Sequence, residues 1–315
     1  MTVSDVHVLA QDMVHRAERQ RLLVFADNRQ DAAFQAGWMR DHARRFRLRA
    51  LMADQIRKGS ISIGDLTAAL DQLLDQDDDL SRALLPEVWS PYSRESEPVK
   101  HSEERRYLLR ITVLREVTTG VKQRVGLEPW GRLRVEYVGL TPETPYVIRL
   151  AEEVGVSADR VADGIAALLD RMRRQLHVLD RQGQIFSRFW REGDREILRG
   201  YLPLMPGVPK ALKLQREEGD DDGRVTQWLS VRGDTVVRQA LRKWGVRDDR
   251  LAERVADLWT FVTEEVRLLA PATLRGSRGR TLPGCAGVYQ IDANQIRLTS
   301  HKGRWRCRTC RRTQV

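Results

Sequence analysis

The chain has 315 residues, of which 41% are hydrophobic and 31% are charged, so it holds enough apolar material for about two folded domains. Its formal net charge is +10, carried mostly by arginine, whose planar guanidinium binds oxyanions with paired hydrogen bonds. These properties exclude a disordered tail and favour DNA or RNA as a partner. No apolar run approaches the roughly 18 residues of a membrane helix, and residues 1–20 lack the apolar core of a signal peptide. With only three cysteines, a disulfide framework is not expected, and we predict a cytoplasmic protein with no membrane partner.

Residues 1–59 begin with a pattern typical of an α/β lobe. The apolar run Leu22–Phe25 predicts a buried strand of a parallel sheet. Asp27 and Asn28 follow as turn and helix-capping residues, and a long helical pattern runs from about Gln30 to Lys58. A strand, a polar corner and a helix make one β-α unit, and nothing else in the chain is expected to supply the remaining parallel strands of such a lobe.

Residues 60–144 predict a helical insertion. The spacing of apolar residues favours helices over Asp65–Leu74 and Glu103–Lys122, and alternation favours a strand over Leu133–Val138. The acidic run Asp77–Asp79 is interpreted as a solvated helix end rather than as a metal site, because adjacent carboxylates rarely converge on one ion.

Residues 145–215 have the pattern of a winged-helix-like unit. A helix from about Tyr146 to Val154 ends at Gly155, Ser157 caps a second helix, and residues 176–188 have the pattern of a strand, a turn and a strand. In a winged helix the second helix enters a groove of the nucleic acid and the hairpin forms the wing. The candidate nucleic-acid contacts are therefore Arg171, Arg173, Arg174, Arg181 and Arg188. The alternative is a packing module whose arginines are only solvated.

The remaining residues divide into a helical part and a basic part. Residues 216–272 predict a helical segment, with helices over about Asp234–Trp244 and Asp248–Leu269. Residues 273–315 accumulate arginine and predict a basic hairpin with a strand on either side of a turn at Asp292–Asn294.

Cys307 and Cys310 form a CxxC pair, which is half of a zinc ribbon. Two thiolates at this spacing in a tight turn can bind one tetrahedral ion, but a structural zinc site needs four ligands. Cys285 and His301 are further possible ligands, although their spacing matches no standard pattern. A redox pair and two free thiols are the alternatives, so zinc is predicted only for an incomplete site.

No catalytic signature is present in the sequence. It contains no GxxxxGK[ST] phosphate loop, no DExH or DExD tetrad after an apolar strand, and no GxSxG, HExxH or GxGxxG motif. An NTPase site needs a phosphate loop and a carboxylate for Mg²⁺. We therefore expect no ATP hydrolysis by this chain alone.

The string from Leu22 to Gly37 has the pattern FxDNRQDAxxQAG and resembles motif IV, with its following helix, in a bacterial subgroup of superfamily 2 DEAD/DEAH-box helicases. In these helicases the motif opens the second RecA-like lobe, and the subgroup carries an insertion with winged-helix character and a cysteine-rich zinc element. The resemblance implies that residues 1–59 are the edge of that lobe and that residues 30–310 fit the insertion. It also implies nucleic-acid contacts from Asn28, Arg29 and Gln30, for which helix capping and packing between lobes are the alternative roles.

The resemblance further implies that the ATP-binding and Mg²⁺-binding motifs precede Met1 and that the QxxGRxxR motif follows Val315. The expected function is then to grip nucleic acid within an ATP-dependent helicase, with ATP and Mg²⁺ bound only by the full-length protein and the other lobes supplied by a separate chain. An independent winged-helix DNA-binding protein and a structural module without nucleic acid are the alternatives. The expected fold is mainly α with short strands: a partial α/β RecA-like edge, a winged-helix-like unit, helical segments and a partial zinc-ribbon hairpin.

Overall fold

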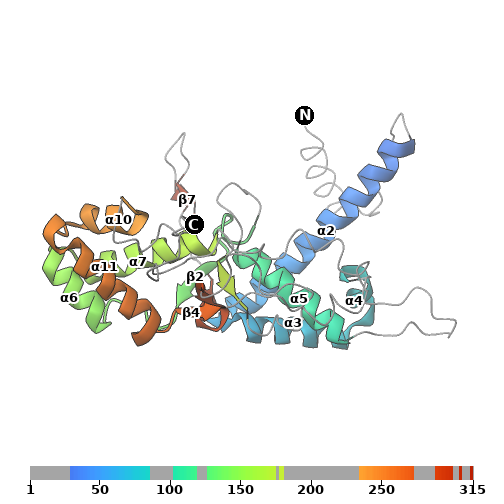
Figure 1. The fold of residues 1–315 in the computed structure, drawn as a ribbon. Coiled ribbons are helices and arrows are strands. Elements are labelled where there is room, and N and C mark those ends of the chain that lie inside the picture. Colours follow the sequence, from blue (N-terminus) through green and yellow to red (C-terminus); the bar gives the residue numbers. More distant parts are fainter. Residues whose placement is uncertain are drawn as a thin grey trace, which may run out of the picture. The chain divides into compact units, whose positions relative to one another are not determined.

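The structure is a computed structural model that describes residues 29–85, 102–118, 126–174, 177–180, 234–272, 288–300, 305–306 and 313–314. The described fold is mainly helical with a few short, mostly antiparallel strands, as expected (Figure 1). The chain divides into two compact units, Met1–Leu51 and Met52–Val315. Among the helices described, none combines the length and the apolar character needed to cross a membrane.

The long helix expected over Gln30–Lys58 is confirmed as α2 (Arg29–Arg57). Its last turn is followed by Gly59, where the helical pattern was expected to stop. The strand predicted at Leu22–Phe25 lies outside the described residues.

Three helices form the first part of the second unit: α3 (Ile63–Gln76), α4 (Asp78–Leu84) and α5 (Ser102–Val117). The backbone N–H of Asp65 donates to the Ser62 hydroxyl at 3.0 Å, which caps α3. Asp77 caps α4 in the same way, because its carboxylate accepts a hydrogen bond from the Leu80 N–H at 2.8 Å. The acidic run was expected to be the solvated end of a helix; instead, Asp77 separates α3 from α4, and Asp78 and Asp79 form the first turn of α4. Helix α3 packs against α5 through an apolar face.

Strands from distant parts of the second unit form a first antiparallel sheet of order β1-β6-β2. They are β1 (Ile61–Ser62), β6 (Ile296–Thr299) and β2 (Arg134–Tyr137). The strand predicted over Leu133–Val138 is therefore confirmed as β2. A short antiparallel pair, β7 (Trp305–Arg306) with β8 (Thr313–Gln314), lies near the end of the chain.

A second three-stranded sheet has the order β3-β5-β4. It is built from β3 (Val178–Leu179), β5 (Val288–Asp292) and β4 (Leu269–Ala272). The central strand β5 runs parallel to β3 and antiparallel to β4. The strand predicted to pair with β3 was the second strand of the wing, residues 184–188. These residues lie outside the described ones, so among the described strands β3 pairs with β5.

The hairpin predicted around Asp292–Asn294 is wrong, because its two strands join different sheets. A 3₁₀ turn, η6 (Ala293–Gln295), separates β5 from β6, and the Asp292 carboxylate caps it by accepting from the Asn294 N–H at 2.9 Å. On either side of the turn, the Asp292 N–H donates to the Leu268 carbonyl and the Gln295 carbonyl accepts from the Val138 N–H. Alternating polarity predicted both strands correctly, but it carries no information about which distant strand each one joins.

Two helix–turn–helix segments complete the second unit. The first consists of α6 (Pro145–Val154) and α7 (Ala158–Arg173), joined through Gly155 in the left-handed conformation at φ +68°. The second begins with α10 (Val236–Trp244) and turns at Gly245, with φ +106°. Glycine is favoured at both turns because it alone adopts a positive φ without a Cβ penalty.

The helix predicted over Asp248–Leu269 is shorter and less regular than expected. It consists of a 3₁₀ turn η4 (Asp248–Arg250), a regular helix α11 (Leu251–Thr260) and a π-helical turn η5 (Phe261–Glu265), and β4 follows from Leu269. The apolar spacing of this segment predicted its buried face, which includes Leu251, Val255 and Leu258.

Candidate nucleic-acid interface

The second helix of the first helix–turn–helix, α7, has one buried and one exposed face. Its buried face packs on α6, α10 and β5 and contains Val161, Ile165, Leu168, Leu169 and Met172. Its outer face carries residues spaced three or four apart, the helical period, which we name the α7 stripe: Arg160, Asp163, Ala167, Arg171 and Arg174.

The α7 stripe has a positive balance of charge. Arg160 and Arg171 are exposed, and neither makes an ion pair with any residue that the structure describes. The single acid of the stripe, Asp163, has a carboxylate oxygen 4.0 Å from Nη2 of Arg134 on β2. Two guanidinium groups on the exposed face of α7 therefore have no ion-pair partner among the described residues.

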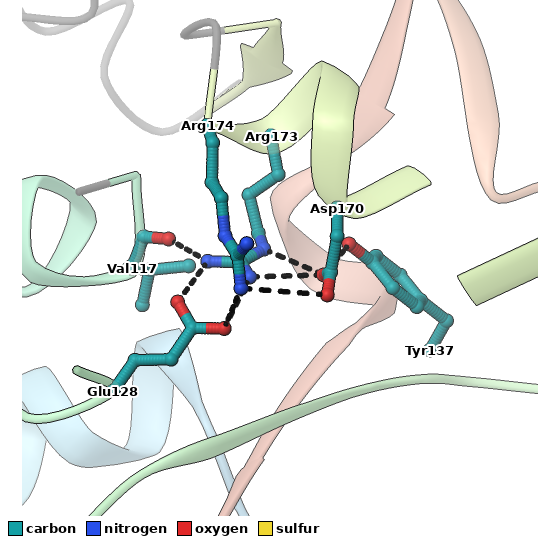
Figure 2. Close-up of polar contacts among 6 residues, drawn as sticks. All are labelled: Val117, Glu128, Tyr137, Asp170, Arg173 and Arg174. Carbon is teal, nitrogen blue, oxygen red and sulfur yellow. Dashed lines mark hydrogen bonds and ion pairs between the residues drawn. The ribbon is translucent and has the colours of Figure 1, made fainter. Parts of the chain in front are cut away.

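Arg173 differs from its neighbours, because its side chain is 0% exposed and lies in a polar network inside the fold (Figure 2). Its Nη1 and Nη2 donate to the two carboxylate oxygens of Glu128 at 3.1 and 2.8 Å. Its Nε and Nη2 donate to Oδ1 of Asp170 at 3.1 and 2.9 Å, and its Nη1 also donates to the carbonyl of Val117. Asp170 accepts a further hydrogen bond from the Tyr137 hydroxyl at 2.8 Å.

This network holds together four segments that are distant in sequence. Glu128 comes from the turn before β2, Val117 from the end of α5, Tyr137 from β2, and Asp170 and Arg173 from α7 (Figure 2). All the donors of Arg173 point at protein oxygens, so it has neither exposed surface nor spare hydrogen bonds for a phosphate. Arg173 therefore fixes the C-terminal end of α7 to the neighbouring segments from inside the fold.

Charges in the network shift the pKa values of its members. Burial on its own lowers the pKa of Arg173, but the electrostatic interactions with Tyr137, Asp170 and Glu128, together with the hydrogen bonds to Glu128, outweigh it, so the pKa is raised. Burial raises the pKa of Glu128, yet its bonds and charge interactions with Arg173 and Arg174 lower it below the ordinary value. Both groups therefore remain ionised at neutral pH.

Arg174 lies at the boundary between the network and the α7 stripe. Its side chain is 31% exposed, and its Nη2 donates to Oε1 of Glu128 at 2.7 Å. The carboxylate of Glu128 is thus shared between an interior arginine and one at the surface (Figure 2). Arg174 can contact a ligand only from the side that faces away from Glu128.

A second set of paired arginines lies on α5 and was not foreseen from the sequence: Arg105 and Arg110 are buried, and Arg106 is exposed. Arg105 and Arg106 donate from Nε to the two oxygens of Asp71 on α3, at 2.6 and 2.7 Å. Arg110 donates from Nε and Nη2 to the two oxygens of Asp180, which follows β3, and both distances are 2.6 Å. Each pair joins residues far apart in the chain, so no local sequence pattern could have revealed it.

His177, which immediately precedes β3, and Gln290 on the neighbouring strand β5 are buried polar residues. His177 is 6% exposed, and its backbone carbonyl accepts from the Ile291 N–H at 3.0 Å. Within the described part of the molecule, its Nδ1 has no hydrogen-bond partner, nor has Nε2 of Gln290. Burial lowers the pKa of His177 below its ordinary value of 6.5.

This burial predicts a pH-dependent stability. Because the folded state favours neutral His177, the unfolded chain takes up its proton at a higher pH than the folded chain does. The stability is therefore complete above pH 6.5 and decreases as the pH falls from 6.5 towards the folded pKa. Urea unfolding above and below this pH should show the decrease in the natural chain and a smaller one in His177→Leu. An equal decrease in both would contradict the prediction.

The other sequence-predicted site residues divide into two groups. Arg29 and Gln30 form the first turn of α2, where the structure describes the backbone but not their side chains. Asn28, Arg181, Arg188, Cys307 and Cys310 lie outside the described residues, as do Cys285 and His301. In the described ranges, no three His, Cys, Asp or Glu side chains gather as a metal site would require. Only Arg171 and Arg174 are therefore placed together, on the exposed face of α7.

No protein-family model, curated protein or solved structure matches this chain.

Proposed function

We propose that this chain grips nucleic acid as part of an ATP-dependent helicase. The observation that carries the proposal is the α7 stripe, where Arg160 and Arg171 are exposed without a carboxylate partner among the described residues. The net charge of +10 and the resemblance of Leu22–Gly37 to helicase motif IV support it. The positive charge attracts phosphate, and the resemblance supports a place for the chain in a two-lobed motor.

The proposed contact is made to the phosphate backbone. Exposed arginines bind phosphate strongly through paired hydrogen bonds, and each contact releases counterions, so binding weakens as salt increases. The α7 stripe offers no Asn or Gln to read an adenine edge. Because the proposed contacts are made to phosphates and not to guanine edges, which arginine can also read, we expect little dependence on base sequence, as suits a motor that moves along its substrate.

In this proposal residues 145–215 act as a winged-helix-like unit whose second helix is α7. Asn28, Arg29 and Gln30 are proposed as additional contacts, on the resemblance alone. Zinc at Cys307 and Cys310 likewise remains a proposal from the CxxC spacing. ATP hydrolysis is assigned to other parts of the helicase, because this sequence has no phosphate loop.

Replacing Arg160 and Arg171 together with alanine tests the proposed contact. We expect affinity for a short DNA duplex of arbitrary sequence to fall roughly tenfold at low salt, and the slope of log affinity against log salt to become shallower by about two. Fluorescence anisotropy over a salt series measures both quantities, and a single-stranded RNA of equal length in parallel distinguishes the two kinds of nucleic acid.

The matched control is Arg82→Ala with Arg247→Ala, which removes the same charge from α4 and from the turn before η4. An equal loss of affinity in this control would show that only the overall charge matters. A natural chain that binds no nucleic acid at low salt would contradict the proposed function and favour a structural module. Nucleic-acid-stimulated ATP hydrolysis by the purified chain would contradict the assignment of catalysis to other segments.

A further inference from the structure

The two helix–turn–helix segments share a sequence pattern. Residues 155–170 and 245–260, aligned without a gap, are identical at seven of sixteen positions. The shared residues of the first segment are Gly155, Val156, Asp159, Arg160, Ala162, Ala166 and Leu168, and those of the second are Gly245, Val246, Asp249, Arg250, Ala252, Ala256 and Leu258.

The aligned positions have the same structural roles. The turn is closed by the same hydrogen bond in both, from Val156 N–H to the Ala151 carbonyl at 3.1 Å and from Val246 N–H to the Leu241 carbonyl at 3.0 Å. Both glycines have a positive φ. Equivalent apolar positions are buried in both segments: Val147 with Val237, Val161 with Leu251, Ile165 with Val255, Leu168 with Leu258, and Met172 with Val262.

The strands that follow the two segments are also equivalent. His177 immediately precedes β3, and Leu268 immediately precedes β4. In the same alignment of the two copies, these two residues are one position apart. Their carbonyls accept hydrogen bonds from β5, from the Ile291 N–H at 3.0 Å and the Asp292 N–H at 2.9 Å respectively. Since β5 is parallel to β3 and antiparallel to β4, the equivalent strands run in opposite directions on its two sides. This is the arrangement that a local twofold axis through β5 would produce.

Contacts between the two segments are reciprocal, as a twofold relation requires. On α7, Gly164 faces the last residue of α10, Trp244, so closely that a Cβ on the glycine would lie 2.3 Å from Cζ2 of the indole. The equivalent residue of α11 is Arg254, whose Nε lies 2.9 Å from Oε2 of Glu153 near the end of α6. Each second helix therefore uses the same position to contact the end of the other first helix.

We propose that residues 145–179 and 235–269 are two copies of one helix–turn–helix–strand unit, and that only the first copy contacts the phosphate backbone. The second part of this proposal rests on the proposed function. It follows from the residues of the second copy that are equivalent to the α7 stripe: Arg250, Glu253, Asp257, Phe261 and Glu264.

These equivalent residues are unsuited to phosphate. The α7 stripe has three arginines and one acid, whereas its counterpart has one arginine and three acids. The remaining arginine, Arg250, has Nη1 3.0 Å from Oε1 of Glu153, so it contributes to the contact between the copies. Phe261, which replaces Arg171, is buried and stacks on Tyr146 with ring centroids 4.4 Å apart. At these positions, the second copy thus packs against the first copy, and we do not expect it to bind phosphate.

Equivalent substitutions in the two copies test the division of roles. With the same DNA duplex and anisotropy assay, Arg160→Ala is expected to lower affinity about three- to fivefold at low salt, and Arg250→Ala to leave it within about twofold. Placing residues of the first copy in the second, by Asp257→Ala with Glu264→Arg, is expected to raise affinity at low salt. Far-UV circular dichroism checks that each variant keeps its helical content.

The outcomes separate the two proposals. If the natural chain binds DNA but Arg250→Ala weakens binding as much as Arg160→Ala, both copies contact the backbone and the division of roles is overturned, while the proposed function stands. If the natural chain does not bind at low salt, the proposed function fails, and the assignment of binding to the first copy fails with it.

Discussion

Arg173→Met is expected to lower the free energy of unfolding by about 3 to 5 kcal/mol at neutral pH, because it removes one partner from a buried charge network. Methionine fills a similar volume but leaves the carboxylates of Glu128 and Asp170 without the guanidinium that both of them bind. Urea unfolding followed by circular dichroism measures this loss. The effect should decrease in acid, since Glu128 has a lowered folded pKa and its contribution is present above the ordinary value of 4.5 and lost as the pH falls through the folded value.

Arg174→Met is the matched control for this prediction. Arg174 binds the same Glu128 oxygen but is partly exposed, so its loss should cost less than about 1 kcal/mol. Equal destabilisation by the two substitutions would show that the interior position of Arg173 has no special energetic role. Because Arg173 has no exposed surface, its effect on nucleic-acid binding should only follow its effect on folding.

Gly164→Ala is expected to destabilise the fold by about 1 to 3 kcal/mol, although alanine is the better helix former by roughly 1 kcal/mol. The new Cβ would lie 2.3 Å from Cζ2 and 2.8 Å from Cε2 of the Trp244 indole, so this half-buried ring or the helix that carries it must shift. Thermal and urea unfolding measure the change. The control is Gly64→Ala in α3, outside both copies. Its new Cβ would meet only ordinary contacts at 3.7 and 3.9 Å, so this substitution should be neutral or stabilising.

A double-mutant cycle connects this prediction to the internal repeat. The first copy has Val154 at the position equivalent to Trp244, so Trp244→Val makes the two helix ends alike. We expect Trp244→Val to remove most of the cost of Gly164→Ala, which gives a favourable coupling energy between the two positions. Additive effects would show that the close approach of Gly164 and Trp244 does not limit packing between the copies.

Local features of the sequence determined most of the helices. Apolar spacing and end signals placed α3, α6, α7 and α10 within a few residues, because a left-handed glycine such as Gly155 acts over one helical turn. The basic balance of charge and the helicase-like string at Leu22–Gly37 were likewise readable from the sequence, and the proposed function still depends on both.

The tertiary structure alone decided which arginines are free and which strands meet. Arg171, Arg173 and Arg174 are near neighbours in the sequence, yet Arg173 is buried on Glu128 while Arg171 is exposed, because a helix turns each residue by about 100° relative to the one before. Likewise β5 and β6, separated by one 3₁₀ turn, join different sheets. Strand pairing and ion pairing depend on distant partners, such as Glu128 for Arg173 and β3 for β5, and a local pattern does not encode these.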